Sequence, residues 1–168
     1  DLLASEPHLV LDDRRWPILP RDEERPPVLV HDGARIEGSL VANGARVSGT
    51  VRGSLLSAGV VVAAGAVIED SIILQDVVIA PGAHVRRSIL DKYVQVGENA
   101  AVGGEAPGSG PEWLGGVTLV GKDARIAAGA RIEPGAIVGV GAMPTDIAGG
   151  VLRAGSVIAN RTWYGEGL

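Results

Sequence analysis

An aliphatic residue returns at every sixth position through much of this chain. The clearest runs are Leu90, Val96, Val102 and Val120, Ile126, Ile132, Val138. An amphipathic helix would instead place apolar residues at i, i+3, i+4 and i+7, and it would not tolerate so many interior glycines. A six-residue step with one aliphatic per step is typical of a β-helix, in which each hexapeptide forms one short strand and a corner. The rhythm therefore predicts an all-β solenoid.

The rhythm extends from about Val30 to Ile158, with some steps shortened to five residues. Three strands would close a triangular coil of about 18 residues, and neighbouring coils would stack about 4.8 Å apart. One aliphatic per step, such as Val61 or Val67, is expected to point inward. Roughly six to seven coils fit the length. Corners are expected where glycine precedes alanine, since glycine adopts positive φ without strain: Gly65-Ala66, Gly82-Ala83, Gly129-Ala130 and Gly135-Ala136.

The composition agrees with this fold. The chain has 168 residues, 25 of them glycine, and hydrophobic residues reach 46% although aromatics make up only 3%. The core must therefore be built from Val, Ile, Leu and Ala. The alternative fold is a β-sandwich with glycine-rich turns. That fold would show period-2 alternation over longer strands, which this sequence lacks.

Two segments interrupt the rhythm and suggest the domain organisation. Residues 103–116 are rich in glycine and proline and predict an exposed loop inserted between coils. Residues 1–29 contain five prolines, which forbid a long helix and predict an extended linker that follows a helix end at Asp1–Ser5. We therefore predict a linker at 1–29, a β-helix at 30–160 and a tail at 161–168.

Charge and composition exclude several classes of function. The net charge of −5 and the pI of about 5.2 do not favour binding to a nucleic acid. The chain has no cysteine, which rules out disulfides, thiol catalysis and zinc sites that use sulfur. No apolar run approaches the length of a membrane span, and no signal peptide is visible. These features fit a cytoplasmic protein that contacts neither membrane nor nucleic acid.

Several motifs in sequence order resemble the C-terminal part of ADP-glucose pyrophosphorylase, also called glucose-1-phosphate adenylyltransferase. The start, DLLASEPHLVLDDRRWPI, looks like the segment that leaves that family's catalytic domain. The step RRSILD at Arg86 to Asp91 and the segment GVTLVGKDARIAAGARI after the loop are similar to coils of its β-helix. The resemblance implies left-handed coils, an exception to the usual right-handed crossover.

The resemblance implies a regulatory and oligomerisation domain of an enzyme that makes ADP-glucose and diphosphate from ATP and glucose 1-phosphate, in glycogen or starch biosynthesis. The catalytic domain would precede Asp1, which is not an initiator methionine, because the family's G-G-x-G-x-R-L loop for ATP phosphates is absent here. The parent enzyme would use Mg and ATP, and this segment no cofactor. The implied partners are its own N-terminal catalytic domain, further copies in a homotetramer and an anionic effector.

Four basic residues are candidates for effector binding. Arg86 and Arg87 match the family's RR step, and arginine suits bidentate contact with phosphate. The alternative for this pair is surface arginines in salt bridges to Asp91 or Glu69. Lys122 and Arg131 are further candidates, with an ordinary surface role as the alternative. In the resembled family, sugar phosphates or phosphate act in clefts between the β-helix and the catalytic domain.

Trp16, Trp113 and Arg161 are candidate interface residues. We predict no catalytic residue and no metal site, because His8, His31 and His84 lie in separate sequence contexts. Two alternatives stay open. The first alternative to the regulatory domain is a stand-alone acyltransferase of the hexapeptide class, with a histidine as general base. The second is a non-catalytic homologue of the pyrophosphorylase that contributes only regulation.

Overall fold

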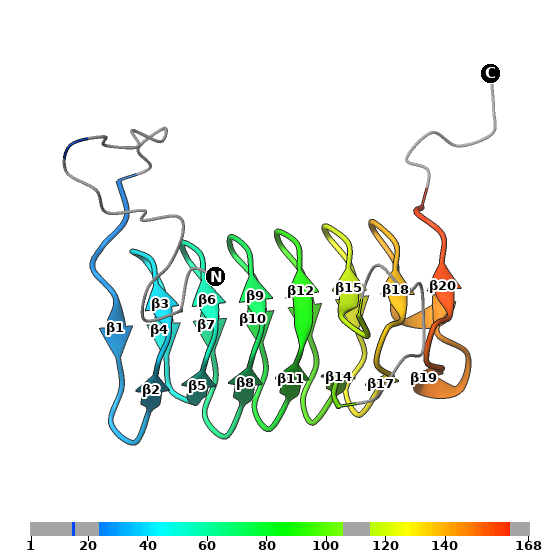
Figure 1. The fold of residues 1–168 in the computed structure, drawn as a ribbon, viewed down its shortest axis with the longest axis horizontal. Coiled ribbons are helices and arrows are strands. Elements are labelled where there is room, and N and C mark those ends of the chain that lie inside the picture. Colours follow the sequence, from blue (N-terminus) through cyan, green and yellow to red (C-terminus); the bar gives the residue numbers. More distant parts are fainter. Residues whose placement is uncertain (1–14, 16–23, 106–114, 162–168) are drawn as a thin grey trace.

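The computed structural model describes Arg15, residues 24–105 and residues 115–161, which form a solenoid of short parallel strands (Figure 1). Trp16 and Trp113, predicted to anchor interfaces, lie outside the described residues. The strands form three sheets, here named A, B and C, with six, seven and seven strands. No helix in the described part of the chain is long and apolar enough to cross a membrane.

Each of the first six coils contributes one strand to each sheet in the order A, B, C, and the last contributes strands to sheets B and C only. Sheet A contains β1 (Leu29–Val30), β4 (Arg46–Val47), β7 (Val61–Val62), β10 (Val78–Ile79), β13 (Gln95–Val96) and β16 (Arg125–Ile126). Sheet B contains β2 (Arg35–Glu37), β5 (Thr50–Arg52), β8 (Val67–Glu69), β11 (His84–Arg86), β14 (Ala101–Gly103), β17 (Arg131–Ile132) and β19 (Val151–Leu152). Sheet C contains β3 (Leu40–Val41), β6 (Leu55–Leu56), β9 (Ile72–Ile73), β12 (Ser88–Leu90), β15 (Thr118–Val120), β18 (Ile137–Val138) and β20 (Val157–Ile158).

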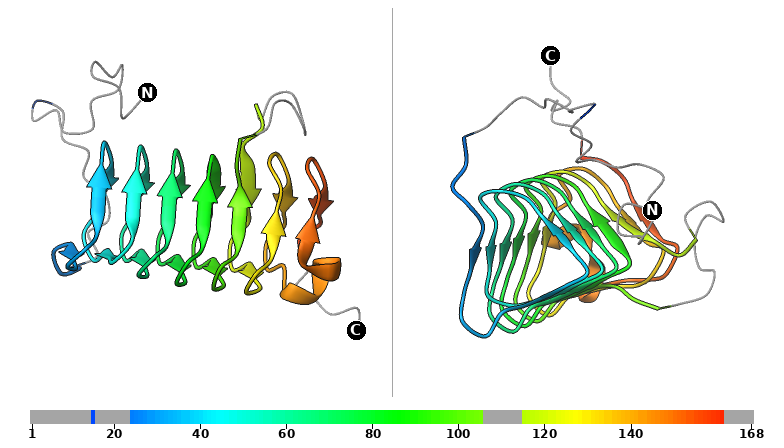
Figure 2. Two further views of the ribbon diagram at one scale, coloured as in Figure 1. Left: turned by 90° about the horizontal axis from the view of Figure 1, so that it is seen from below. Right: turned by 60° about the vertical axis from the view of Figure 1, so that its left-hand side comes forward.

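The coils have a triangular cross-section (Figure 2). Seen from the N-terminal end, the chain turns counter-clockwise as it recedes, so the solenoid is left-handed. All strand pairs are parallel, with partners from successive coils. The expected fold, a left-handed parallel β-helix with six to seven coils, is confirmed.

The core is a stack of aliphatic side chains inside the triangle. Leu90, Val96 and Val102 are buried, as the six-residue step predicts. The predicted phase was wrong at Val61 and Val67, which are only half-buried, whereas the following residues Val62 and Ile68 point inward. Both members of each pair are aliphatic, so the rhythm alone did not indicate which one faces the core.

The coils are shorter than the expected 18 residues in the first half of the solenoid. Val62 pairs with Ile79 and Ile68 with Val85, which makes the repeat 17 residues long there. The short step lies between sheets B and C, as from Ile68 to Ile73. At the predicted glycine–alanine corners, Gly65 and Gly82 have positive φ and the alanines that follow are buried.

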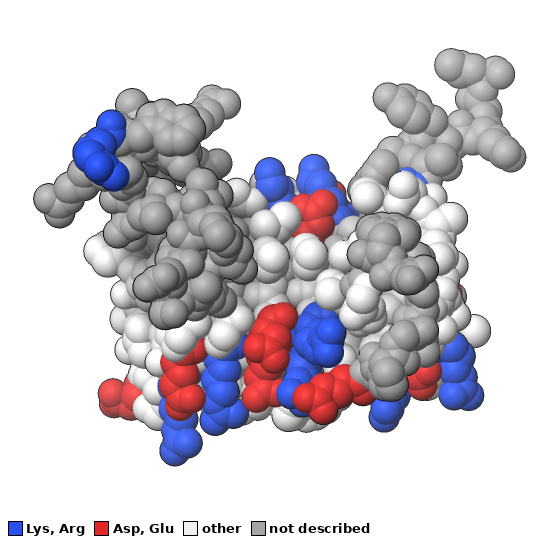
Figure 3. Space-filling model, in the orientation of Figure 1, with Lys and Arg blue, Asp and Glu red and all other residues white. Residues whose placement is uncertain are grey.

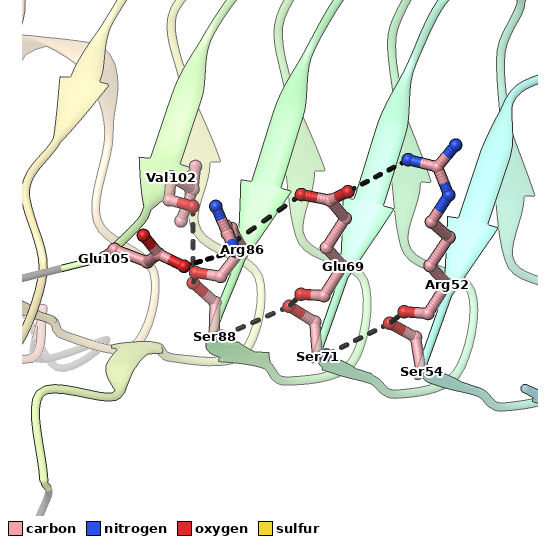
Figure 4. Close-up of polar contacts among 8 residues, drawn as sticks. All are labelled: Arg52, Ser54, Glu69, Ser71, Arg86, Ser88, Val102 and Glu105. Carbon is pink, nitrogen blue, oxygen red and sulfur yellow. Dashed lines mark hydrogen bonds and ion pairs between the residues drawn. The ribbon is translucent and has the colours of Figure 1, made fainter. Parts of the chain in front are cut away.

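A ladder of hydroxyl groups stabilises the tight corner between sheets B and C (Figure 4). The Ser71 hydroxyl donates to the Glu69 carbonyl at 2.6 Å and accepts from the Ser88 backbone N–H at 3.2 Å. The Ser71 N–H donates to the Ser54 hydroxyl at 3.0 Å in the same way. Ser39, Ser54 and Ser71 therefore each satisfy backbone groups both in their own corner and in the next.

Ser71→Ala is expected to lower the free energy of unfolding by about 1–3 kcal/mol, because a buried N–H and a carbonyl lose their partner. Urea denaturation followed by circular dichroism measures the change. Ser57→Ala is the matched control, since the Ser57 side chain makes no hydrogen bond within the described residues and is half-buried. An equal effect of both substitutions would contradict the role of the ladder.

The C-terminal end of the core is closed by two short 3-10 turns. These are η2 (Pro144–Asp146) and η3 (Ala148–Gly150), which follow β18 where sheet A would have its next strand. Ile147 between them is 5% exposed and joins the core cluster. Gly141 has positive φ, so the GxG of residues 139–141 forms a corner, as the sequence predicted.

Candidate functional site

The outer face of sheet C carries an unbroken row of aliphatic side chains. Each strand of this sheet holds two adjacent aliphatics, and because side chains alternate in a strand, one faces the core and the other faces out. The register aligns the outward ones directly above one another. We name these residues the sheet C row: Leu40, Leu55, Ile72, Ile89, Leu119, Ile137 and Val157.

Sheets A and B have no such row. In sheet A, Arg46, Gln95 and Arg125 interrupt the outward positions, and in sheet B the outward residues include Arg35 and His84. In the space-filling view, the middle of sheet C is an uncharged band between two charged edges (Figure 3). A contiguous apolar band on a protein surface marks an interaction site.

The C-terminal half of the row lies in a shallow hollow of about 750 Å³. Its lining includes Ile89, Leu119, Ile137 and Val157 of the row, with Asp91 and Asn160 at its margin. Toward the other end of the row, Leu40 is 43% exposed and Ile72 is 41% exposed. A large apolar surface with few polar groups fits a folded partner better than a small charged molecule.

A column of alternating charges follows the ends of the sheet B strands, at the corner that borders sheet C (Figure 4). The guanidinium of Arg52 lies 3.4 Å from Glu37 and 3.2 Å from Glu69, and Arg86 lies 3.6 Å from Glu69 and 2.6 Å from Glu105. Arg86 therefore belongs to this charge column, and Glu69 is one of the two partners that the sequence suggested. Exposed pairs of this kind each contribute about 0–1 kcal/mol.

Arg87 lies outside the charge column. It occupies the corner position after β11 with φ of 45°, in the left-handed region. Gly53 and Asp70 have the same conformation at the equivalent corners of the two preceding coils. Its guanidinium donates to the Gly115 carbonyl at 3.2 Å, and the side chain makes no ion pair with any described residue. Arg87 is thus better placed than Arg86 to bind an added anion.

The other two effector candidates lie elsewhere. Lys122 stands at the opposite edge of sheet C, 3.9 Å from Asp123 and 5.6 Å from the centre of the Tyr93 ring. Arg131 is an outward residue of sheet B, 3.9 Å from Glu133. The four basic candidates therefore form no single cluster on the β-helix, and whether any of them binds an effector stays a prediction.

Arg161, the remaining interface candidate, is held by η2. Its guanidinium donates to both oxygens of the Asp146 carboxylate at 2.8 and 2.9 Å. This hydrogen bonding, with a further bond from the Met143 N–H, lowers the pKa of Asp146 to about 2. Arg161 thus ties the end of the described chain to η2.

The described histidines are separate from one another. His31 follows β1 and His84 begins β11, and both are exposed. Within residues 24–105 and 115–161, no group of three or more His, Asp or Glu side chains is arranged to hold a metal ion.

Comparison with known proteins agrees with the repeat architecture. Residues 27–108 match the family model described as GlmU-like, C-terminal hexapeptide. The acetyltransferase domain of PglB from Neisseria gonorrhoeae, solved with acetyl coenzyme A, covers 81% of this chain and 56% of its own at 21% identity. Its TM-score of 0.35 is too low to support an argument about function.

The fold defines the chain as a parallel β-helix, and its residues 27–108 match a hexapeptide family model. Its curated relatives include glucose-1-phosphate adenylyltransferases, as the sequence motifs predicted. The protein from Thermomicrobium roseum is 44% identical over 94% of this chain, and that from Frankia casuarinae is 39% identical over 76%. The chain spans only 38% and 33% of the length of these two relatives.

The sequence motifs did not reveal the sheet C row, although a signal for it exists. Every third step of the rhythm contains two adjacent aliphatics, as in Leu55-Leu56, Ile72-Ile73 and Ile137-Val138. A strand can bury only one residue of such a pair against the core. Doubled aliphatics that recur once per coil therefore predict a sheet with an apolar outer face.

Proposed function

We propose that this chain is the regulatory and oligomerisation domain of a glucose-1-phosphate adenylyltransferase. Catalysis, from ATP and glucose 1-phosphate to ADP-glucose and diphosphate, would take place in a domain outside this chain. One observation carries the proposal: 94% of the chain aligns with only 38% of an adenylyltransferase at 44% identity. Mg and ATP would bind to the catalytic domain, and the β-helix would need no cofactor of its own. The expected location is the cytoplasm.

The sheet C row supports a partner within the same protein. A folded catalytic domain packed against this row would remove its aliphatic side chains from water, at about 25 cal/mol per Å² of apolar area. The partner we propose is therefore the enzyme's own catalytic domain. With the catalytic domain packed on the row, the charged side chains along both borders of sheet C would lie close to the boundary between the two domains.

An anion that binds at this boundary would favour one arrangement of the domains and so change catalysis at a separate site. Arg87 is the basic candidate with no acidic partner in the described chain, and it stands at such an edge. The proposed homotetramer would use further surfaces, among them the first coil, where Leu29 and Val30 are each 50% exposed.

The proposal is tested by sequencing the coding frame upstream of Asp1 and assaying the encoded protein for ADP-glucose formation. We expect an upstream nucleotidyltransferase sequence with a glycine-rich ATP loop, activity in the longer protein and none in the 168-residue chain. An upstream frame without such a domain would overturn the proposal. A longer protein that is folded but inactive, yet alters an active homologue on mixing, would indicate the regulatory homologue instead.

Arg87→Ala in the longer protein is expected to weaken activation or inhibition by phosphate or a sugar phosphate by about tenfold, since one charge-assisted contact is lost. The half-maximal effector concentration is the measurement. Arg35→Ala is a control of the same charge on sheet B, at an exposed residue that is not an effector candidate. An unchanged effector concentration in Arg87→Ala would remove this residue from the effector site.

A further inference from the structure

The segment before β1 continues the corner column between sheets C and A. In successive corners of this column, the Asp76 N–H donates to the Ala58 carbonyl at 3.1 Å and the Gly59 N–H donates to the Asn43 carbonyl at 3.2 Å. The Gly44 N–H makes the corresponding bond to the Pro26 carbonyl at 2.6 Å. Residues 24–28 therefore lie along this edge of the solenoid, next to sheet C.

Arg25 extends along the same column to the third coil. Its guanidinium donates to both carboxylate oxygens of Asp76, at 2.5 and 2.9 Å. The side chains of Arg25 and Asp76 are only 23% and 31% exposed. Hydrogen bonds from Arg25 hold the pKa of Asp76 below its usual range, so the carboxylate is charged at neutral pH.

Two glycines leave the space that the Arg25 side chain occupies. A Cβ atom on Gly44 would lie 3.0 Å from Arg25 Cδ, and one on Gly59 would overlap both the Arg25 guanidinium and the Asp76 carboxylate. Glycine is not required by the backbone of this corner, because Tyr93 and Asp123 occupy it in later coils with positive φ. Its presence at 44 and 59 therefore follows from the path of Arg25.

The first coil needs such support because it has a neighbour on one side only. Its strands β1, β2 and β3 each stand at the end of a sheet, and edge strands present unpaired backbone groups. Half of the surface of Leu29 and Val30 is exposed. Terminal elements of this kind open most readily.

We infer that Arg25 and Asp76 form a latch that fastens the incoming chain to the third coil and thereby closes the first coil against opening. The latch also fixes the place at which the preceding chain reaches the solenoid, beside the edge of sheet C. Opening it would let the first coil separate from the second and free the strand edge of the second coil for pairing with another chain. This inference does not depend on the proposed enzymatic function.

Hydrogen exchange of Asp76→Asn in the 168-residue chain tests the latch. Asparagine tolerates positive φ but lacks the charge and one acceptor oxygen. Exchange at the amides of Leu29, His31 and Gly44 is expected to become about tenfold faster, while Gln95 in a central coil stays unchanged. Asp123→Asn, at the equivalent corner of a later coil, is the matched control and should exchange like the wild type.

Two further variants separate the latch from a general weakening of the corner. Gly59→Ala fills the path of Arg25, whereas Gly65→Ala imposes similar backbone strain, at φ of 74° against 73°, with no atom of Arg25 nearby. Only Gly59→Ala should accelerate exchange at Leu29 and Gly44. Wild-type exchange at these amides in Asp76→Asn, or equal acceleration in the two glycine variants, would overturn the inference.

Discussion

Ile73→Ala is expected to lower the free energy of unfolding of the 168-residue chain by about 2–5 kcal/mol. Ile73 is fully buried and stacks between Leu56 and Leu90 in the core, so its truncation leaves a cavity between coils. A solenoid has only neighbouring coils to support each core residue, and a cavity weakens two such interfaces at once. Urea denaturation followed by circular dichroism gives the change.

The neighbouring residue provides the control for this prediction. Ile72 has the same side chain, lies in the same strand and faces outward, with 41% of its surface exposed. Ile72→Ala should cost less than about 1 kcal/mol. A larger loss of stability in Ile72→Ala than in Ile73→Ala would contradict the assignment of Ile73 to the core and Ile72 to the surface. It would also contradict the assignment of the sheet C row to the surface.

Ile72→Asp in the longer protein is expected to reduce both the activity and the effector response by at least about tenfold. The substitution would place an unpaired carboxylate in the apolar contact that we propose between the β-helix and the catalytic domain, and burying such a charge is costly. ADP-glucose formation with and without effector measures both effects. Circular dichroism of the 168-residue chain with the same substitution should remain unchanged, because Ile72 is not part of the core.

Val78→Asp is the matched control on another face. Val78 is also β-branched, is also 41% exposed and lies in the next coil, but it belongs to sheet A. Its substitution should leave activity and effector response within about twofold of the wild type. Equal losses in the two variants would argue against a docking role specific to sheet C, even in an active adenylyltransferase.

The fold could be predicted because one physical requirement recurs in every coil. An aliphatic side chain must fill the axis at each strand, and a residue that tolerates positive φ must stand at each corner. Leu90, Val96 and Val102 follow the first rule, and Gly65 and Gly82 follow the second. The phase was missed at Val61 and Val67 because hydrophobicity does not distinguish two adjacent valines or a Val-Ile pair.

The surface was harder to predict, since it depends on which coils stand next to each other. Glu37 and Arg52 are 15 residues apart, and Arg86 and Glu105 are 19 apart across the start of the insertion, so no fixed spacing reveals the charge column. Arg25 and Asp76 are 51 residues apart and meet only because the chain coils three times between them. Such pairs require the register of the strands, which periodicity alone does not give.

The charge column restricts how this solenoid can change its length. Duplicating one coil, such as residues 54–70, would add one aliphatic per strand to the core (Leu56, Val62 and Ile68), one serine to the hydroxyl ladder and one residue to the sheet C row, all in keeping with their neighbours. The same duplication would stack two like charges, because Glu69 alternates with Arg52 and Arg86 along the column. Like charges directly opposite in adjacent strands are destabilising. In the first four coils, the chain can therefore lengthen or shorten without this electrostatic conflict only by an even number of coils.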